Sequence, residues 1–133
     1  QAGGIAAVFD QVRGHLVEQG RAEDPIQSGR LAGLYLAAQA AADAVAKAAR
    51  CWDGSAIPST LAHVAAARVA VYQAGEQALT LAQAAVGLQA MFVDHPLAAT
   101  LTDLAVYLRQ PGPDAQRART GQAVASGLLA PNL

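Results

Sequence analysis

The sequence has 133 residues, of which 53% are hydrophobic and 14% charged, and its formal net charge is −1. This composition excludes an intrinsically disordered chain, and the near-neutral charge argues against nucleic acid or an anionic membrane surface as a partner. No apolar run is long enough to span a bilayer, so we expect one globular domain over residues 1–133.

Apolar residues at helical spacing predict a first helix from Gly4 to Glu18. Asp24 followed by Pro25 predicts the start of a second helix, which extends to Cys51, because aspartate caps free amides and proline fits the first turn. The residues of this helix that we expect to face the core recur every three or four positions: Leu31, Leu34, Ala38, Ala41, Val45, Ala48 and Trp52. Its alanine-rich sequence favours helix and lets other helices approach closely.

The third predicted helix is long and runs from Thr60 to Met91, after a turn with the sequence "DGSAIPST" in which Ser59 or Thr60 would act as the cap. The stripe expected on one side of this helix is Leu61, Val64, Arg68, Tyr72, Gly75, Leu79, Ala82 and Val86. Glycine in a helix interior costs ~1 kcal/mol relative to alanine. We therefore expect Gly75 to mark a close contact with another helix.

A fourth helix is predicted to start at Asp94 as its cap, with Pro96 in the first turn, and to end before Pro111. A final helix is predicted from Asp114 to Leu128. Long helices joined by short turns reverse the chain at each turn. The fold class predicted is therefore all-α, an antiparallel up-down four-helix bundle with a short extra C-terminal helix.

Residues that carry chemistry are few and scattered. His15, His63 and His95 lack the spacing that metal sites use, so we expect surface or capping histidines and no metal site. Cys51 is the one cysteine and cannot form an internal disulfide, which is typical of a cytoplasmic protein, and we expect it to pack. Arg68 lies on an apolar stripe, where it is either a site residue or an arginine that extends its charged end to water. No catalytic residue is predicted.

Three stretches carry a family resemblance: "HPLAATLTDLAVYLRQPGPD", "RAEDPIQSGRLAGLYLAAQAAADAVAKAARCWDG" and "ARVAVYQAGEQALTLAQAAVG". Together they resemble the C-terminal helical domain of acyl-CoA dehydrogenases and related flavoproteins. The resemblance implies the same helical bundle, a homo- or hetero-oligomer formed through helical faces, and an FAD-dependent oxidoreductase. In that family an N-terminal helical domain and a middle β-domain complete the site, so this chain would be a fragment or a split subunit.

The resemblance implies few site residues. Arg21 corresponds to the family's arginine-rich turn and Gly87 to the first glycine of its Gly-Gly turn, both of which contact FAD. Asp103 matches the aspartate of an Arg-Asp pair, but Thr102 replaces the arginine. The usual position of the catalytic glutamate holds Pro111, so the isolated chain is not expected to be catalytic.

Three interpretations follow from these patterns. The first is the C-terminal helical domain of an acyl-CoA dehydrogenase-like flavoprotein, which contributes packing, oligomer contacts and an edge of the FAD site. The alternatives are a non-enzymatic helical interaction or oligomerisation module, and an inactive paralogue that keeps the fold without the flavin. For the two candidate residues themselves, Arg21 as a solvated turn residue and Gly87 as a plain helix terminus remain open.

Overall fold

The computed structural model describes residues 1–52 and 57–131, and these form five α-helices and one 3-10 helix with no β-strand among them. The elements in chain order are α1 (Ala2–Glu18), α2 (Pro25–Arg50), α3 (Ile57–Val86), the 3-10 helix η1 (Gly87–Met91), α4 (Pro96–Leu108) and α5 (Pro113–Ala125). The all-α prediction is thus confirmed. Among these helices none is long and apolar enough to cross a membrane.

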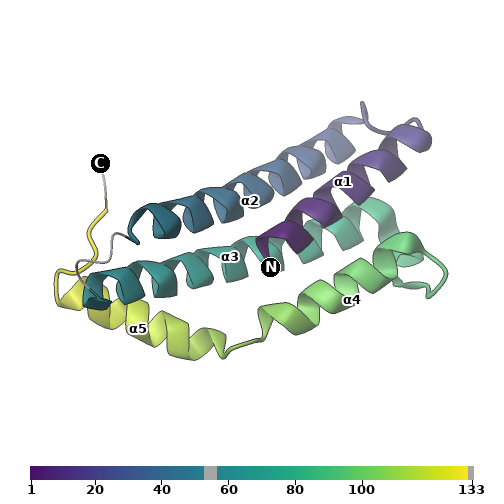
Figure 1. The fold of residues 1–133 in the computed structure, drawn as a ribbon. Coiled ribbons are helices and arrows are strands. Elements are labelled where there is room, and N and C mark those ends of the chain that lie inside the picture. Colours follow the sequence, from purple (N-terminus) through teal and green to yellow (C-terminus); the bar gives the residue numbers. More distant parts are fainter. Residues whose placement is uncertain (53–56, 132–133) are drawn as a thin grey trace.

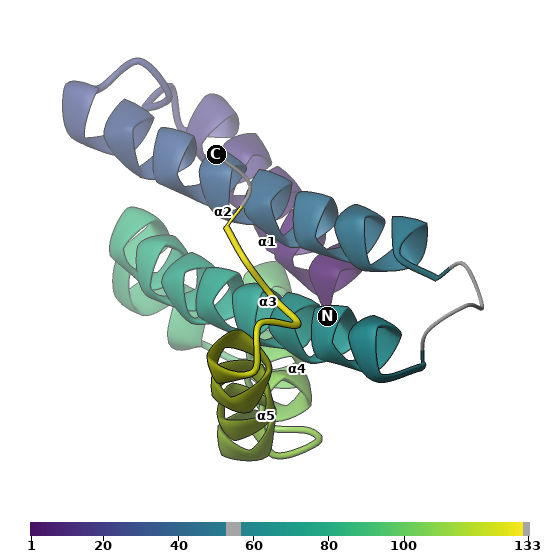
Figure 2. The ribbon, with the colours of Figure 1, turned by 90° about the vertical axis from the view of Figure 1, so that its left-hand side faces the viewer.

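The long helix α3 is the centre of the molecule, and each of the other four α-helices packs against it. Helices α1, α2 and α3 run in alternating directions, and α4 and α5 then follow one another back along α3 (Figure 1). Viewed from one end, α2 lies above α3 and α5 lies below it (Figure 2). Helix α1 contacts α2, α3 and α4, but α1 has 17 residues and α3 has 30.

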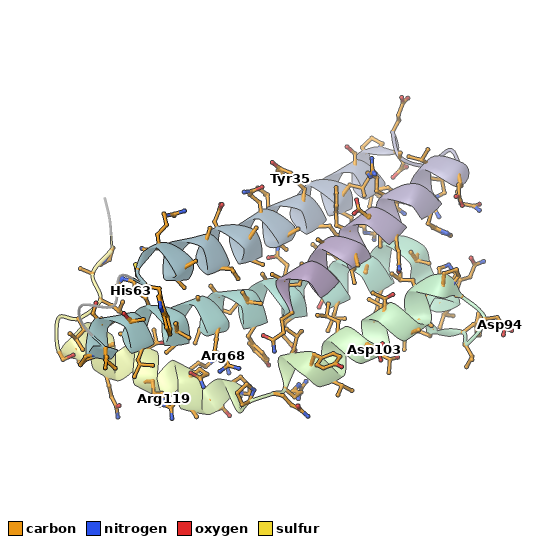
Figure 3. The ribbon with its side chains drawn as sticks, viewed as in Figure 1. Tyr35, His63, Arg68, Asp94, Asp103 and Arg119 are labelled. Atoms are coloured by element: carbon orange, nitrogen blue, oxygen red, sulfur yellow. The ribbon has the colours of Figure 1, made fainter. Side chains whose placement is uncertain are left out.

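Two helix starts that the sequence predicted can be compared with the structure. The carboxylate of Asp24 accepts hydrogen bonds from the backbone N–H groups of Ile26 and Gln27, both at 3.0 Å, so this cap is confirmed. The predicted cap Asp94 is wrong, because His95 holds the cap position and its Nδ1 accepts from the N–H of Leu97 at 3.2 Å. The residue before a proline is held in an extended conformation, which puts the cap one residue later. Asp94 is exposed in the connection that precedes α4 (Figure 3).

The ends of the third helix also differ from the prediction. The α-helix begins at Ile57, so Ser59 and Thr60 lie inside it and neither is its cap. The Thr60 hydroxyl instead donates to the carbonyl oxygen of Cys51 at 3.2 Å. The α-helix ends at Val86 rather than Met91, and the remaining residues form η1. Part of the predicted turn, residues 53–56, lies outside the described residues.

Other bounds agree more closely. Helix α1 starts two residues before the predicted Gly4 and ends at the predicted Glu18. Helix α5 spans Pro113–Ala125, three residues shorter than predicted at its C-terminal end. The chain there leaves the helix through Gly127, whose φ of +76° is left-handed and favours glycine.

The core is built from large side chains on the outer helices and small ones on α3. The outer helices α1, α2 and α4 bury a row of large residues: Ile5, Val8, Val12, Leu16, Leu34, Leu97, Leu101, Leu104 and Leu108. Helix α3 buries mainly alanine, with Gly75 among them. A Cβ on Gly75 would lie 2.5 Å from Cδ2 of Leu108, so the predicted close helix contact at Gly75 is confirmed.

Three residues that the sequence predicted on core-facing stripes lie at the surface. Val45 is 48% exposed, Trp52 71% and Leu61 60%. Val45 belongs to the C-terminal half of α2, Trp52 lies just after that helix, and Leu61 belongs to the N-terminal half of α3. Helix α1 does not reach this region because it begins near the middle of α3 (Figure 1). The predicted stripes are therefore more buried in the half that α1 covers than in the half that it does not reach.

Candidate functional site

The connections α1–α2 and α3–α4 lie at the same end of the molecule, which we call the turn end (Figure 1). Arg21 lies in the first of these connections, and Gly87 begins the second. The structure therefore brings the two residues that the resemblance singled out to one end of the fold. The turn end is the candidate site.

The position of Arg21 is set by the way α1 ends. Gly20 has a φ of +64°, and its N–H donates to the carbonyl oxygen of Val17 at 3.0 Å. The N–H of Arg21 donates to the carbonyl oxygen of Leu16 at 2.8 Å. This pair of bonds is the Schellman motif. In it a residue with left-handed backbone conformation ends the helix, and the N–H groups of that residue and the next donate to the last free carbonyl oxygens. Arg21 is thus the first residue after a fixed helix terminus.

The side chain of Arg21 meets a buried amide on α2. With the amide of Gln27 oriented so that its oxygen faces the arginines, this oxygen accepts from Nη2 of Arg21 at 2.7 Å and from Nη1 of Arg30 at 3.2 Å. Gln27 is 2% exposed, so the two guanidinium groups meet at a buried amide. Within the described part of the chain, neither guanidinium lies within ion-pair distance of a carboxylate. The guanidinium groups of Arg21 and Arg30 therefore converge on one uncharged acceptor, the amide oxygen of Gln27.

Gly87 lies level with this cluster along the molecule. A Cβ on Gly33 of α2 would lie 2.7 Å from Cδ1 of Leu81 on α3, and the two helices are antiparallel. Gln27 lies six residues before Gly33 along α2, and Gly87 lies six residues after Leu81 along α3. Gln27 and Gly87 are therefore about equally far along the helix axes from the contact between Gly33 and Leu81. Gly87 has a φ of +77°, which ends α3 at this point. Its glycine identity thus has a structural reason whether or not it contacts a ligand.

Replacing Gly87 with alanine should lower the free energy of unfolding by about 1 to 2 kcal/mol, because an L-residue is disfavoured at positive φ. No atom other than its own neighbours lies within 4 Å of the added methyl group, so a clash does not contribute. Gly14→Ala is the matched control, since Gly14 lies inside α1 with equally open space and ordinary helical geometry. Chemical denaturation should show a gain of up to ~1 kcal/mol for this control. Equal effects of the two substitutions would contradict the explanation from φ.

The segment that follows Gly87 exposes large apolar side chains. Leu88 is 80% exposed and Val93 95%, and Met91 and Phe92 are also mostly exposed. We call this group of four the apolar segment. Single exposed apolar residues are ordinary, but a contiguous group on a short connection is typical of a surface that contacts another molecule.

The remaining candidates from the sequence do not gather into a reactive cluster. Asp103 is exposed on α4 and its side chain lies far along that helix from Asp94 (Figure 3). The rings of His15 and His95 meet edge to face, with centroids 5.4 Å apart, and Nδ1 of His63 is 2.9 Å from the carbonyl oxygen of Ser59. No group of histidine, cysteine and carboxylate side chains that could hold a metal occurs among the described residues.

Two surface hollows lie away from the arginine cluster. One, of about 450 Å³, lies between α3, η1 and α4 and is lined by Met91, Leu101 and Arg109 among others. The other, of about 340 Å³, lies between α2, α3 and α5. Lys47 and His63 supply the ionisable groups in its lining, which is otherwise mostly alanine. Both hollows are predominantly apolar.

Comparison with protein-family models, with curated proteins and with solved structures gives no match. The cluster at the turn end contains two residues that sequence reasoning missed, Gln27 and Arg30. They stand three positions apart on α2, which places them on the same side of the helix. The spacing of Gln27 and Arg30 next to the turn could have indicated a polar cluster on this side of α2. Nothing in the sequence indicated that the side chain of Arg21 would contact them.

Proposed function

We propose that the chain is a helical packing domain of an acyl-CoA dehydrogenase-like flavoprotein, in which the turn end contacts other parts of the enzyme and forms an edge of the FAD site. The observation that carries this proposal is the combination of the arginine cluster and the apolar segment at one end of the fold. Arg21 and Gly87, which the resemblance assigns to FAD binding, both belong to that end.

The arginine cluster supports the cofactor part of the proposal. FAD contains a pyrophosphate, and arginine is well suited to phosphate because its planar guanidinium presents several donors. Arg21 and Arg30 meet at Gln27 with no carboxylate partner among the described residues, so an anion beside them would gain two charge-assisted contacts. The donor set therefore fits an anionic portion of the cofactor. FAD, when bound, would supply hydride acceptance, and these residues would only bind and orient it.

The apolar segment supports the packing part of the proposal. Its four exposed side chains, between Leu88 and Val93, would be removed from water by a second polypeptide surface. The absence of a glutamate at Pro111 is compatible with a packing role, since the chain then brings no base of its own at that position. The proposed partners are other domains of the flavoprotein or another subunit.

The proposal includes a four-helix up-down bundle as the architecture of the domain. In this arrangement α1, α2 and α3 are the first three members, and α4 and α5 share the fourth position. The competing function is a non-enzymatic interaction module, which the apolar segment would serve equally well without FAD. Flavin content separates these two functions.

The test uses the polypeptide that the natural gene encodes, purified and assayed for visible flavin absorbance and for FAD affinity. The double substitution Arg21→Ala/Arg30→Ala should weaken FAD binding by roughly 10- to 100-fold, because each charged hydrogen bond is worth about 1.5 to 3 kcal/mol and part of this is recovered by water. Arg119→Ala is the matched control, since Arg119 is an exposed arginine on α5 (Figure 3).

Gln27 loses both hydrogen-bond partners in the double variant, so circular dichroism of both variants checks that the fold is unchanged. A protein that takes up no flavin would favour the interaction module. Flavin binding that the double substitution leaves unchanged would remove Arg21 and Arg30 from the site while leaving the flavoprotein assignment standing.

A further inference from the structure

The hollow of about 340 Å³ between α2, α3 and α5 lies in the half of the molecule away from the turn end. The residues that follow α5 rise from that helix across α3 to α2 (Figure 2), and Leu129, Ala130 and Pro131 line a further side of the hollow. Pockets for small molecules begin at roughly 300 Å³ and are mostly apolar, with a few polar groups that fix the ligand. This hollow, which we call the alanine hollow, has that size and that composition.

The space is open because the two long helices present only methyl groups to it. Five alanines of α2 and α3 line the alanine hollow: Ala44, Ala48, Ala66, Ala67 and Ala70. No side chain at these positions is long enough to reach across to α5. At about 30 Å³ for an atom of the size of a water molecule, the space holds a body of about ten non-hydrogen atoms. Its apolar walls would remove such a body from water.

The charged and polar groups of the lining select the sign of a ligand's charge. Lys47 of α2 and His63 of α3 are its ionisable residues, and α5 and the residues after it contribute none. Among the described residues no carboxylate lies within ion-pair distance of the Lys47 ammonium group. The Thr120 hydroxyl donates its hydrogen to the carbonyl oxygen of Gln116 at 2.8 Å, so towards a ligand it only accepts. The described lining thus carries positive charge and no negative charge.

The imidazole of His63 has one nitrogen engaged and one free for a ligand. His63 is half-buried on α3, beside the last turns of α2 (Figure 3). Its Nδ1 is 2.9 Å from the carbonyl oxygen of Ser59, and because a carbonyl oxygen only accepts, Nδ1 carries a hydrogen in this contact. Nε2 makes no hydrogen bond to the described part of the chain. It donates when the ring is protonated, so it can bind one oxygen of a carboxylate.

We propose that the alanine hollow binds a small organic monocarboxylate whose apolar body has about ten non-hydrogen atoms. The body lies against the alanines of α2 and α3, and the carboxylate accepts hydrogen bonds from the Lys47 ammonium group and from Nε2 of protonated His63. A neutral molecule of the same shape gains only the apolar contacts, and a cation is repelled by Lys47. This binding site uses neither the turn end nor FAD, so it is independent of the proposed function.

The experiment titrates the protein with naphthoate and with two probes that carry the same ring, naphthylmethanol and naphthylmethylamine. Calorimetry at pH ~6 should give a Kd of roughly 10 to 100 μM for naphthoate, a value about 10-fold higher for the alcohol and no binding of the amine. Lys47 is the only lysine in the sequence. Reductive methylation with isotope-labelled formaldehyde therefore marks it and the N-terminal amine, and keeps the positive charge. Naphthoate should shift the NMR signal of Lys47, and the N-terminal signal is the internal control.

Two matched pairs of substitutions locate the binding in the alanine hollow. Lys47→Met should weaken naphthoate binding by roughly 10-fold and leave the alcohol unaffected. Arg50→Met is its control, because Arg50 belongs to the same last turn of α2 but does not line the hollow. Ala70→Leu fills the space and should abolish binding of both probes, whereas Ala40→Leu, at an exposed position of α2 outside the hollow, should leave it unchanged. Far-UV circular dichroism checks that each variant is folded.

The pH dependence of binding tests the role of His63. Raising the pH from ~6 to ~8 removes the hydrogen from Nε2, so naphthoate should bind several-fold more weakly at the higher pH. His63→Phe keeps an aromatic ring in the lining but has no nitrogen, so the affinity of this variant should not change between the two pH values. Lys47 is the other ionisable group in the described lining, and it is present in both proteins.

The proposal would be overturned by any of three results. One is the absence of saturable naphthoate binding up to ~1 mM. Another is an equal affinity for naphthoate and naphthylmethanol, or an affinity for naphthoate that Lys47→Met leaves unchanged, since the charge would then play no part. The third is binding that survives Ala70→Leu, which would place the ligand elsewhere. None of these results involves FAD or the turn end, so the proposed function would be unaffected.

Discussion

Replacing Leu104 with alanine should lower the free energy of unfolding by roughly 3 to 5 kcal/mol, the largest effect that we expect from a single substitution in this chain. Leu104 is 3% exposed on α4, and its Cδ1 lies 3.2 Å from where a Cβ on Gly4 would be. The side chain thus fills the contact between α4 and α1, where the backbone of α1 approaches closely. Truncation would remove apolar burial and leave a cavity between two helices.

Val106→Ala is the control for this prediction, because Val106 lies two residues further along the same helix and is mostly exposed. Its effect should stay within about 0.5 kcal/mol. Denaturant unfolding followed by far-UV circular dichroism measures both values. A loss for Leu104→Ala no larger than that of the control would mean that α4 does not pack on α1 in solution.

Replacing Gly75 with valine should cost roughly 2 to 3 kcal/mol by overpacking. The new Cβ would lie 2.5 and 2.6 Å from the two methyl carbons of Leu108 and 3.1 Å from its Cγ. Leu108 is buried, so its side chain has little room to move away. Gly29→Val is the control, since Gly29 lies inside α2 with no atom in reach of an added Cβ.

The same contact predicts a coupling between the two positions. Leu108→Ala alone should cost about 2 to 5 kcal/mol as a core truncation. In the double variant the valine enters the space that the leucine leaves, so the combined cost should fall below the sum of the single costs by at least ~1 kcal/mol. Strict additivity in a denaturant double-mutant cycle would show that α3 and α4 do not meet at Gly75.

The turn end illustrates how far the candidate site could be predicted. Arg21 and Gly87 were found through a family resemblance, and the structure brings them to the same end of the molecule. Gln27 and Arg30 were missed because the meeting of Arg21 with Gln27 depends on the direction in which the chain leaves α1. Gly20 sets that direction with a positive φ, a backbone property that the spacing of apolar residues does not reveal.

Local signals in the sequence determined the helical class, the number of helices and most of their bounds, since alanine content, prolines and caps act over a few residues. Asp24 is the clearest case, because the carboxylate and the amides that it caps are neighbours in the chain. The cap of α4 was assigned one residue too early, and α3 was extended past Gly87, because a single backbone angle ends it.

Only the tertiary structure decided which parts of the apolar stripes are buried. The spacing of Ala41 and Val45 shows that they share a side of α2, but it does not show how long the helix that lies against them is. Burial requires a partner at the same height along the axis, and α1 supplies one for Ala41 but not for Val45 or Trp52. An apolar stripe is a property of one helix, whereas a core needs several helices in contact, and for this reason Val45 and Trp52 remain exposed.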